Sequence, residues 1–490
     1  MAAMTGAASS RAIVGAVLLA WLMVLARSWV YLWFPHASFD SDQAIVGLMA
    51  KHLSEGRAFP LYLYGYSYML AVESWLAVPY FWVAGPTAAA LRASLIGTNL
   101  AVVTVLIYGL VRFGGLRPLA ALVPVVFFAF APPDTTAQLI DAGGGTIEPF
   151  LWVLILWFVR DRPFVFGAIL AIGFLNREFT VYAVPVLIAG QLWNRSFFTH
   201  ATLRRWLFSL VAFVAVWQTV QAVTPLADLM GPGTRGAVSG VSSAQMENLT
   251  RRMRVDVWQM PANTWTLLRG EVLKILGGQP INVLAEQGRT WMGWALGVFA
   301  LVGVGRLLWL ARTGERALSS AAMGWYVLGI GLMAIVGYAL TRPTVIVTPR
   351  YLVLSIYIPV GLTAVWLALE PRRVVRGVVT ACVVIWALTA GIDNWRQFDK
   401  FATQYPTDPM QPIIAALDQR GVTIAEADHW RAYKLTFLTR ERIKVASTDV
   451  VRITEYRTLA DARGPDLVTL QRTPCPGEEP IGDLYVCGGR

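Results

Sequence analysis

The sequence predicts an all-helical polytopic membrane protein of about eleven transmembrane helices, followed by a small α/β domain outside the membrane. The first observation is composition: of 490 residues, 56% are hydrophobic and 14% are charged, whereas soluble proteins carry about 25% charged residues. The second is that apolar runs approaching the roughly 20 residues needed to cross a bilayer recur over the first four-fifths of the chain. These runs lie at residues 12–34, 92–111, 118–132, 147–160, 164–175, 180–193, 206–226, 289–311, 320–340, 351–369 and 374–391.

The distribution of basic residues orients these runs in the membrane. The formal net charge is +11, but the basic residues form small clusters in alternate links, as the positive-inside rule requires, so we expect no nucleic-acid partner. The clustered residues are Arg11, Arg112, Arg117, Arg160, Arg162, Arg195, Arg204, Arg205, Arg312, Arg316, Arg372, Arg373 and Arg376. With these links cytoplasmic, the outer segments are 35–91, 133–146, 176–179, 227–288, 341–350 and the chain after about 392. We expect the first run to be retained, since it is long and lacks a clear small-residue cleavage site.

The charged fraction rises after Trp395, and the chain from about residue 398 has the pattern of a compact α/β module. We therefore divide the protein into a transmembrane domain, 1–391, and an extracytoplasmic domain, 392–490. Alternating periodicities predict the elements of the second domain. They are a helix at 412–420, a strand at 422–426, a helix at 432–438 and a strand at 443–446.

Three cysteines divide between these two domains. Cys382 lies in the last apolar run, whereas Cys475 and Cys487 lie in the exported tail. An oxidising compartment favours a disulfide between the latter two over metal ligation.

Two outer segments are expected to be helical without crossing the membrane. Residues 45–53 place apolar side chains and His52 on one helical face, and Gly56 ends that pattern. The Tyr- and Trp-rich segment 66–83 is interpreted as a helix on the membrane surface in which Glu73 faces water; counting it as a span would reverse the later basic clusters. The segment 227–288 predicts a flexible Gly-rich loop at 231–236 followed by an interfacial helix.

Acidic residues follow two of the outer helix ends. Asp40 and Asp42 come directly after the first run, and Asp40 with Gln43 has the form of a capping box. Capping explains one acid, so we expect a functional role for Asp42. Glu148 follows a Gly-rich loop that starts at Asp141; it either serves a ligand that the loop approaches or favours the dipole of the following helix.

Basic residues face the same compartment. Arg177 interrupts an apolar stretch too long for one span, so the chain is expected to turn at the outer surface, where Arg177 either serves the site or forms a solvated pair with Glu178. Arg342 and Arg350, the latter followed by Tyr351, flank an outer loop and would either hold a phosphate or anchor the helices at the interface. The histidines His36, His52, His200 and His429 lack metal-ligand spacing, and we expect packed or surface side chains.

In this order, the motifs resemble the GT-C polytopic glycosyltransferases, which include protein O-mannosyltransferases and lipid A aminoarabinose transferases. The resemblance covers residues 12–391 and rests on DQA at 42–44 with the following helix, residues 85–92, EPF at 148–150, NREF at 176–179 with AVPVL at 183–187, and RY at 350–351. YGYSYM at 64–69 and ADHWRAY at 427–433 look like segments of uncharacterised bacterial members.

The resemblance implies an inverting transferase that takes a sugar from a polyprenyl-phosphate donor to a glycan, lipid or protein acceptor outside the bacterial inner (plasma) membrane. Asp42 falls on the family's catalytic Asp. The substrate-binding candidates are Asp40, Glu148, Arg177, Arg342, Arg350 and Tyr351. Gln43 replaces the family's usual Glu, which leaves a divalent metal an open possibility, and the family's basic residue near Met69 is missing.

Two rival functions keep the same topology. A transporter or flippase of lipid-linked sugars is expected to carry polar residues and broken helices near the membrane midplane. The charges here lie at outer helix ends, which favours an enzyme. An oligosaccharide ligase or polymerase would differ only in using a diphosphate donor.

Overall fold

The computed structural model describes residues 5–66, 68–229, 256–278, 290–313, 321–340 and 349–488. Each of the eleven predicted runs contains a helix. Proline at the first or second position starts three of them, where the missing N–H costs no hydrogen bond. The helices are α1 (Thr5–Trp33), α4 (Ala88–Phe113), α5 (Pro118–Ala129), α7 (Glu148–Val159), α8 (Pro163–Asn176), α9 (Ala183–Trp193), α10 (His200–Leu229), α14 (Thr290–Thr313), α15 (Ala322–Leu340), α16 (Tyr357–Leu369) and α17 (Arg373–Thr403).

Several of these helices are long and apolar enough to span a membrane. Among the described residues, 5 helices meet the length and hydropathy of a span, or 6 when α5 is joined to α6 (Pro133–Leu139), from which it is bent by 87°. The single helices are Ser10–Trp33, Ala88–Phe113, His200–Leu226, Ala322–Leu340 and Arg373–Thr403. The remaining apolar helices are shorter, so eleven spans stays a prediction.

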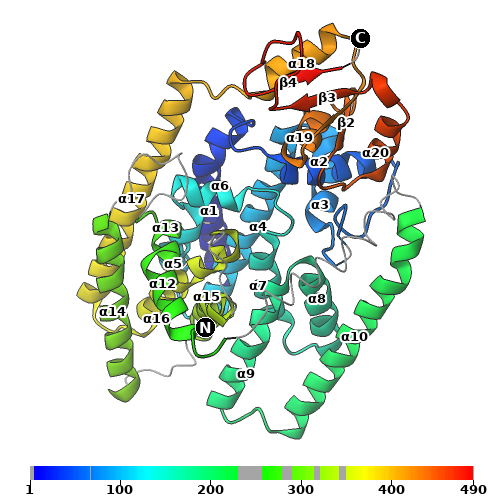
Figure 1. Ribbon diagram of the computed structural model, residues 1–490. Helices are drawn as coiled ribbons and strands as arrows, with labels where there is room; N and C mark the ends of the chain where they lie inside the picture. Colours follow the sequence, from blue (N-terminus) through cyan, green and yellow to red (C-terminus); the bar gives the residue numbers. More distant parts are fainter. Residues whose placement is uncertain are drawn as a thin grey trace.

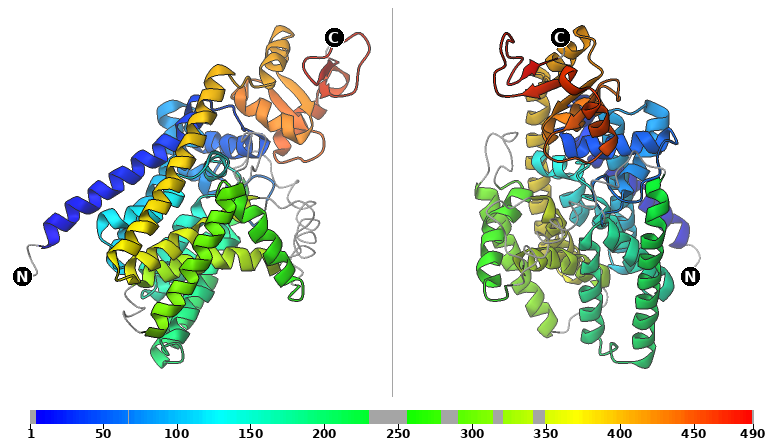
Figure 2. Two further views of the ribbon diagram at one scale, coloured as in Figure 1. Left: turned by 90° about the vertical axis from the view of Figure 1, so that its left-hand side faces the viewer. Right: turned by 45° about the vertical axis from the view of Figure 1, so that its right-hand side comes forward.

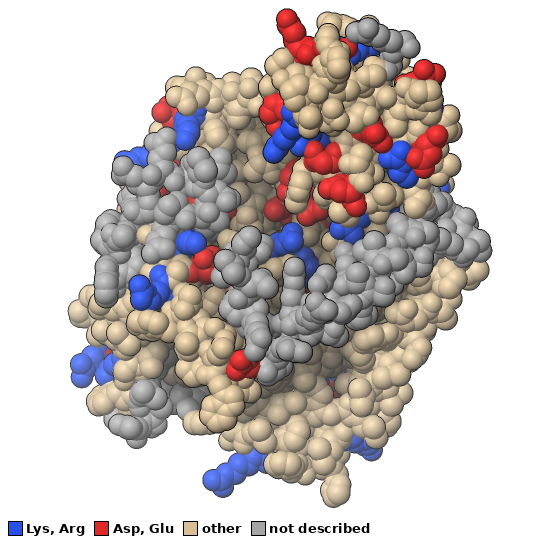
Figure 3. All heavy atoms as spheres, viewed as in Figure 1, with Lys and Arg blue, Asp and Glu red and all other residues tan. Residues whose placement is uncertain are grey.

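The long helices run between two ends of the molecule (Figures 1 and 2). The C-terminal module lies at one end, together with α2 (Ser41–Ser54) and α3 (Val72–Ala84). The links from α9 to α10 and from α16 to α17, which carry basic residues, lie at the opposite end, and Figure 3 shows Lys and Arg side chains along that lower edge. This arrangement fits the alternation of basic links in the sequence.

The C-terminal module is the α/β unit that the sequence predicts, with three further elements. Its helices are α18 (Met410–Gln419), α19 (His429–Leu438) and α20 (Thr454–Asp461), and its strands are β1 (Ile424–Ala427), β2 (Lys444–Ser447), β3 (Val468–Gln471) and β4 (Tyr485–Cys487). The sheet has the order β2-β1-β3-β4, with β1 parallel to both neighbours and β4 antiparallel to β3. The local patterns did not predict α20, β3 or β4.

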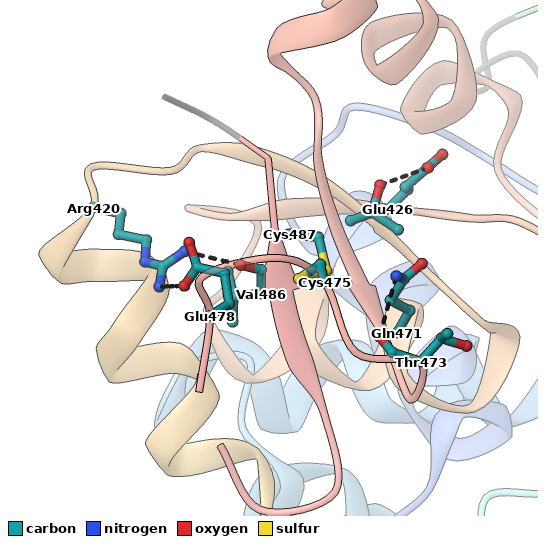
Figure 4. The surroundings of a disulfide bond; sticks show 9 residues. Arg420, Glu426, Gln471, Thr473, Cys475, Glu478, Val486 and Cys487 are labelled. Atoms are coloured by element: carbon teal, nitrogen blue, oxygen red, sulfur yellow. Dashed lines mark hydrogen bonds and ion pairs between the residues drawn. A yellow bond between two sulfur atoms is a disulfide. The ribbon is translucent and has the colours of Figure 1, made fainter. Parts of the chain in front are cut away.

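A disulfide closes the end of this module (Figure 4). Cys475 and Cys487 are bonded across a loop with a sequence separation of 12. Beside it, Arg420 at the end of α18 donates hydrogen bonds to the Glu478 carboxylate at 2.6 Å and to the Val486 carbonyl at 3.0 Å. The third cysteine, Cys382, is free and exposed on α17.

The module packs onto the helices and shares part of their core. The helix α17 continues without a break past residue 391 to Thr403. The side chains Phe401, Tyr433, Phe437 and Tyr456 belong to the same buried apolar cluster as residues of the long apolar helices. A Cβ atom at Gly47 of α2 would lie 2.5 Å from the Phe437 ring, so glycine at this position allows α19 to approach α2 closely.

Of the two outer segments that were expected to be helical, 45–53 lies within α2, whereas in 66–83 the helix begins only at Val72. Gly56 follows α2 with a φ of +68°, the left-handed conformation in which glycine commonly ends a helix. The helix α3 packs against α2 and α4. In the segment 227–288, α12 (Met260–Arg269) carries an exposed Trp265 and a buried Leu267 and is followed by α13 (Glu271–Ile275), whereas the expected loop at 231–236 lies outside the described residues.

Candidate functional site

The site begins where α1 ends, and buried Arg92 of α4 fixes that turn. Its guanidinium donates to the carbonyl oxygens of Tyr31, Phe34 and Ala37 at 3.2, 3.4 and 2.5 Å. The last carbonyl groups of a helix have no partner within the helix, so a buried arginine can satisfy several of them at once. Arg92 thereby holds the segment from which α2 starts.

Asp40 is the N-cap of α2. Its Oδ1 atom accepts the backbone N–H of Gln43 at 3.0 Å. The Gln43 side chain donates to the Ser38 carbonyl at 2.7 Å, so the capping box that the sequence indicated is only half formed. Burial raises the pKa of Asp40, and the nearby Asp42 raises it further, against the lowering effect of the Gln43 hydrogen bond. A binding role for Asp40 remains a prediction.

Asp42, in the first turn of α2, lies against a histidine of the C-terminal module. The His429 Nε2 atom is 3.2 Å from Asp42 Oδ1. The Asp42 side chain is 32% exposed, so it is the accessible member of the pair. Burial alone would raise the pKa of Asp42, but the hydrogen bond with His429 and the positive charges of Arg350 and Arg452 hold it below its ordinary value. The carboxylate is therefore ionised at neutral pH.

Sequence patterns did not indicate His429, which we expected to be a packed or surface side chain. The histidine is buried and starts α19, whose N-cap is Asp428. Its only signal was membership of the segment 427–433, one of those that resemble uncharacterised GT-C members. His52, in contrast, is a packed histidine as expected: it is buried, and its Nδ1 atom lies 2.9 Å from the Tyr64 hydroxyl.

A second buried cluster, formed around Glu441, docks the module onto the first outer loop. The carboxylate accepts hydrogen bonds from Lys51 at 2.5 Å, Arg57 at 2.8 Å and the Tyr456 hydroxyl at 2.7 Å, and it lies 3.2 Å from His52 Nε2. Burial opposes ionisation, but the hydrogen bonds from His52 and Arg57 and the adjacent Lys51 lower the pKa of Glu441 strongly. This cluster lies between the module and the first outer loop, and none of these contacts involves Asp42.

Arg452 makes a further docking contact from the module. Its guanidinium donates to the Gly65 carbonyl at 3.1 Å and to the Tyr66 hydroxyl at 2.9 Å, and it lies 4.2 Å from the centre of the Tyr66 ring. Arg452 also adds positive charge near Asp42. No sequence pattern indicated this arginine.

The expectation that Glu73 faces water is wrong. The side chain is 2% exposed and accepts the backbone N–H groups of Gly144, Gly145 and Thr146 at 2.8, 2.6 and 3.1 Å. Gly144 and Gly145 have φ values of +80° and +88°, which glycine adopts without strain. The prediction failed because the Tyr- and Trp-rich segment has no polar face that shows which way Glu73 points. The direction of this side chain depends instead on a loop about 70 residues away in the sequence.

Two further acids lie on either side of this glycine loop. Burial, together with the charges of Asp40 and Glu73, raises the pKa of Asp141 well above its ordinary value, and Arg350 and Arg92 only partly offset this effect. Glu148 starts α7 and is buried, and its carboxyl oxygens have no hydrogen-bond partner among the described residues. Its place at the first helical position fits both of the roles that the sequence left open.

Two arginines converge on the glycine loop and on Tyr351. Arg177 follows the last residue of α8, where the chain breaks into the 3-10 helix η1 (Glu178–Tyr182), and its Nη2 atom donates to the Gly143 carbonyl at 3.4 Å. The guanidinium groups of Arg177 and Arg350 lie 5.9 and 5.3 Å from the centre of the Tyr351 ring. The structure thus brings Arg177, Arg350 and Tyr351 together, whereas Arg342 lies outside the described residues.

The electrostatic surroundings differ between the two arginines. Arg177 is buried, so it is not the solvated partner of Glu178 that the alternative required. Burial lowers the pKa of Arg350, but Tyr351, Asp42 and Asp141 outweigh this effect and raise it. The Nε atoms of both arginines are buried without a hydrogen-bond partner among the described residues, which leaves N–H donors for an anionic ligand.

The Asp42 end of the site lies against the C-terminal module, through His429 and Arg452. Figure 3 shows a hollow below the module, with acidic and basic side chains gathered around it. Within the described ranges, no group of three or more His, Cys, Asp or Glu residues has a metal-binding arrangement.

No protein-family model and no curated protein matches this sequence. Among solved structures, the chain is similar to ArnT from Cupriavidus metallidurans, whose crystal structure has undecaprenyl phosphate bound. The sequence identity is 11%, the TM-score is 0.57, and the match covers 97% of this chain and 96% of ArnT. This likeness supports a GT-C-like fold over nearly the whole chain.

Proposed function

We propose that the protein is an inverting glycosyltransferase that moves a sugar from a polyprenyl-phosphate donor to an acceptor hydroxyl outside the bacterial inner membrane. The observation that carries the proposal is Asp42, an accessible carboxylate held ionised at the mouth of the helix bundle and close to Arg350. A glycosyl phosphate already has a good leaving group, so a single base suffices where a glycosidase needs two carboxylates.

In this mechanism Asp42 accepts the proton of the acceptor hydroxyl as its oxygen attacks the anomeric carbon. The bond between that carbon and the phosphate oxygen breaks on the opposite face, its electron pair stays on the departing lipid phosphate, and the configuration inverts. Arg177 and Arg350 stabilise the phosphate charge by hydrogen bonds. The ring of Tyr351 lies beside both guanidinium groups, and the Glu73-bound glycine loop supports Arg177 through the Gly143 carbonyl.

Two observations support the lipid-linked donor and the orientation. ArnT, to which the fold is similar, was crystallised with undecaprenyl phosphate. The acids and arginines lie at the helix ends near the C-terminal module, opposite the basic links that the positive-inside rule places in the cytoplasm. The site and residues 392–490 then face the periplasm or exterior, and Arg342, Asp40 and Glu148 remain candidate substrate contacts.

The test is transfer of radiolabel from a panel of polyprenyl-phosphate sugars to extracted envelope glycans, lipids and proteins by the purified full-length chain. We expect labelled product with wild type and almost none with Asp42→Asn. Movement of lipid-linked sugar across liposomes without transfer would instead identify a transporter or flippase. Transfer from polyprenyl-diphosphate donors alone would identify a ligase or polymerase.

A further inference from the structure

The C-terminal module places one side chain directly on the proposed base. Asp42 and His429 come from α2 and α19 and are separated by 387 residues of sequence, yet their side chains are 3.2 Å apart. The histidine is 7% exposed and the aspartate 32% exposed. The pair therefore presents its carboxylate to ligands and keeps its imidazole within the protein.

Backbone and ring contacts fix the position of this imidazole. The His429 N–H donates to Asp449 at 2.8 Å, and the His429 carbonyl accepts from the Ser41 hydroxyl at 2.5 Å, directly beside Asp42 in the sequence. The rings of Trp430 and Tyr433 lie 5.2 and 5.4 Å from the imidazole, centre to centre. Such a side chain loses little further entropy when it holds a partner, which is what a positioning group requires.

The carboxylate determines which group donates the hydrogen bond in this contact. An ionised Asp42 only accepts hydrogen bonds, so Nε2 of His429 must carry a proton. The other ring nitrogen, Nδ1, is buried without a hydrogen-bond partner in the described part of the chain. One N–H is thus directed at Oδ1 of Asp42.

Other contacts besides Asp42–His429 dock the module onto the helices. The ion pairs of the buried Glu441 carboxylate with Lys51 and Arg57 and the contacts of Arg452 join the same two parts of the molecule. A partly exposed ion pair such as Asp42–His429 contributes a small stabilisation that a double-mutant cycle can still detect, so it is not the main docking contact. The contact is therefore better explained by what it does to Asp42.

We infer that His429 is a positioning residue for Asp42, so that the glycosyl-transfer site is completed by the C-terminal module. This inference rests on the proposed function. The Nε2–H group holds one carboxylate oxygen in place while Asp42 takes the acceptor proton, and it favours the ionised form that can do so. His429 itself contacts neither donor nor acceptor in this role.

The test compares His429→Ala and His429→Gln with wild type, and uses His200→Gln on the exposed start of α10 as a matched control. We expect His429→Ala to lower kcat about 10- to 100-fold, the usual range for loss of a group that orients a reacting residue, with the donor KM nearly unchanged. His429→Gln retains a side-chain N–H and should recover much of kcat, and His200→Gln should equal wild type. A wild-type kcat in His429→Ala would overturn the inference. It would also be overturned if kcat fell in both His429 variants only in proportion to the loss of folded protein.

A thermal-unfolding cycle with Asp42→Asn, His429→Ala and the double variant tests the pairing without an activity readout. The shifts in Tm should be non-additive, since the two residues share one interaction. If the wild type transfers sugar and the Tm shifts of the two single variants add up to that of the double variant, this inference alone is overturned. A wild type that transfers no sugar would overturn the proposed function, and with it the catalytic meaning of the pair.

Discussion

The Glu73 carboxylate of α3 accepts the backbone N–H of Gly145 at 2.6 Å, and the same carboxylate accepts the N–H groups of the residues on either side. A buried acid is thus the anchor of a loop made of successive backbone donors. Because Arg177 donates to the carbonyl of Gly143 in that loop, Glu73 also supports the position of Arg177.

Replacing Glu73 by Gln should destabilise the protein. Glutamine has one acceptor oxygen in place of two charged ones, and its amide N–H₂ would face backbone donors. Loss of charge-assisted hydrogen bonds costs on the order of 1.5–3 kcal/mol, so Tm should fall clearly in thermal unfolding followed by tryptophan fluorescence. The control is Glu479→Gln on the exposed tail. Equal Tm values for both variants would show that the loop does not depend on Glu73.

Asp42→Asn should remove activity while preserving the fold. Asparagine keeps the size of the side chain but cannot take the acceptor proton, and loss of a general base lowers the rate about 10²- to 10⁴-fold. The matched control is Asp40→Asn, which should be much less affected because Asn is as good an N-cap as Asp. Transfer rates are compared at matched amounts of folded protein. Near-normal transfer by Asp42→Asn would leave Asp40 or Glu148 as the acid to examine.

Arg177→Ala and Arg350→Ala should each weaken binding of the lipid-phosphate donor. A charge-assisted hydrogen bond contributes about 1.5–3 kcal/mol, which corresponds to roughly a tenfold or greater increase in Kd. Donor binding to the purified protein measures this change directly. Arg162→Ala, on an exposed residue at the opposite end of the helices, provides the control. Unchanged Kd in both site variants would assign these arginines to structural roles alone.

The Glu441 cluster predicts a pH dependence of stability. The pKa of the Glu441 carboxyl is lower in the folded protein than its ordinary value of 4.5. The folded state therefore binds fewer protons than the unfolded state as pH falls below that value. The stabilisation is then fully present above about pH 4.5 and is lost as pH falls toward the folded-state pKa. Glu441→Gln should lower Tm at pH 7, and the gap from wild type should shrink at acid pH. A constant gap across pH 3.5 to 7 would contradict this explanation of docking.

The Cys475–Cys487 disulfide should stabilise the C-terminal end of the chain. A cross-link over a loop of this length is worth about 3 kcal/mol in the chain-entropy model. The double variant Cys475→Ser, Cys487→Ser should therefore show earlier proteolysis of the tail in limited digestion. Mass mapping without reductant should recover the bridged peptides from intact membranes. Free thiols at both positions would count against either the bond or export of the tail.

Local patterns predicted what depends on neighbours in the sequence. The eleven apolar runs became helices, Asp40 became a cap, and Gly56 ended α2, because each follows from spacing within a few residues. Likewise, four elements of the C-terminal module followed from periodicity. The arginine cluster followed from the resemblance and the expected topology.

The remaining features depend on contacts that are distant in the sequence. Glu73 meets residues about 70 positions away, and His429 and Glu441 meet the first outer loop across nearly 390 positions. Nothing in the segment around Glu73 distinguishes an acid that faces water from one that anchors a loop. The proposed domain boundary at 391 likewise has no local mark in the structure, because α17 passes through it.

The separation of Asp42 from His429 has a consequence for how the protein is made. Asp42 is synthesised among the first tenth of the chain, and its partner only after all eleven apolar helices have been translated. If the positioning role holds, the nascent protein has no complete site until its last segment has crossed the membrane and docked. Full activity then requires the complete chain, and a product truncated before α19 would lack the positioning group and should transfer sugar more slowly than the full-length protein.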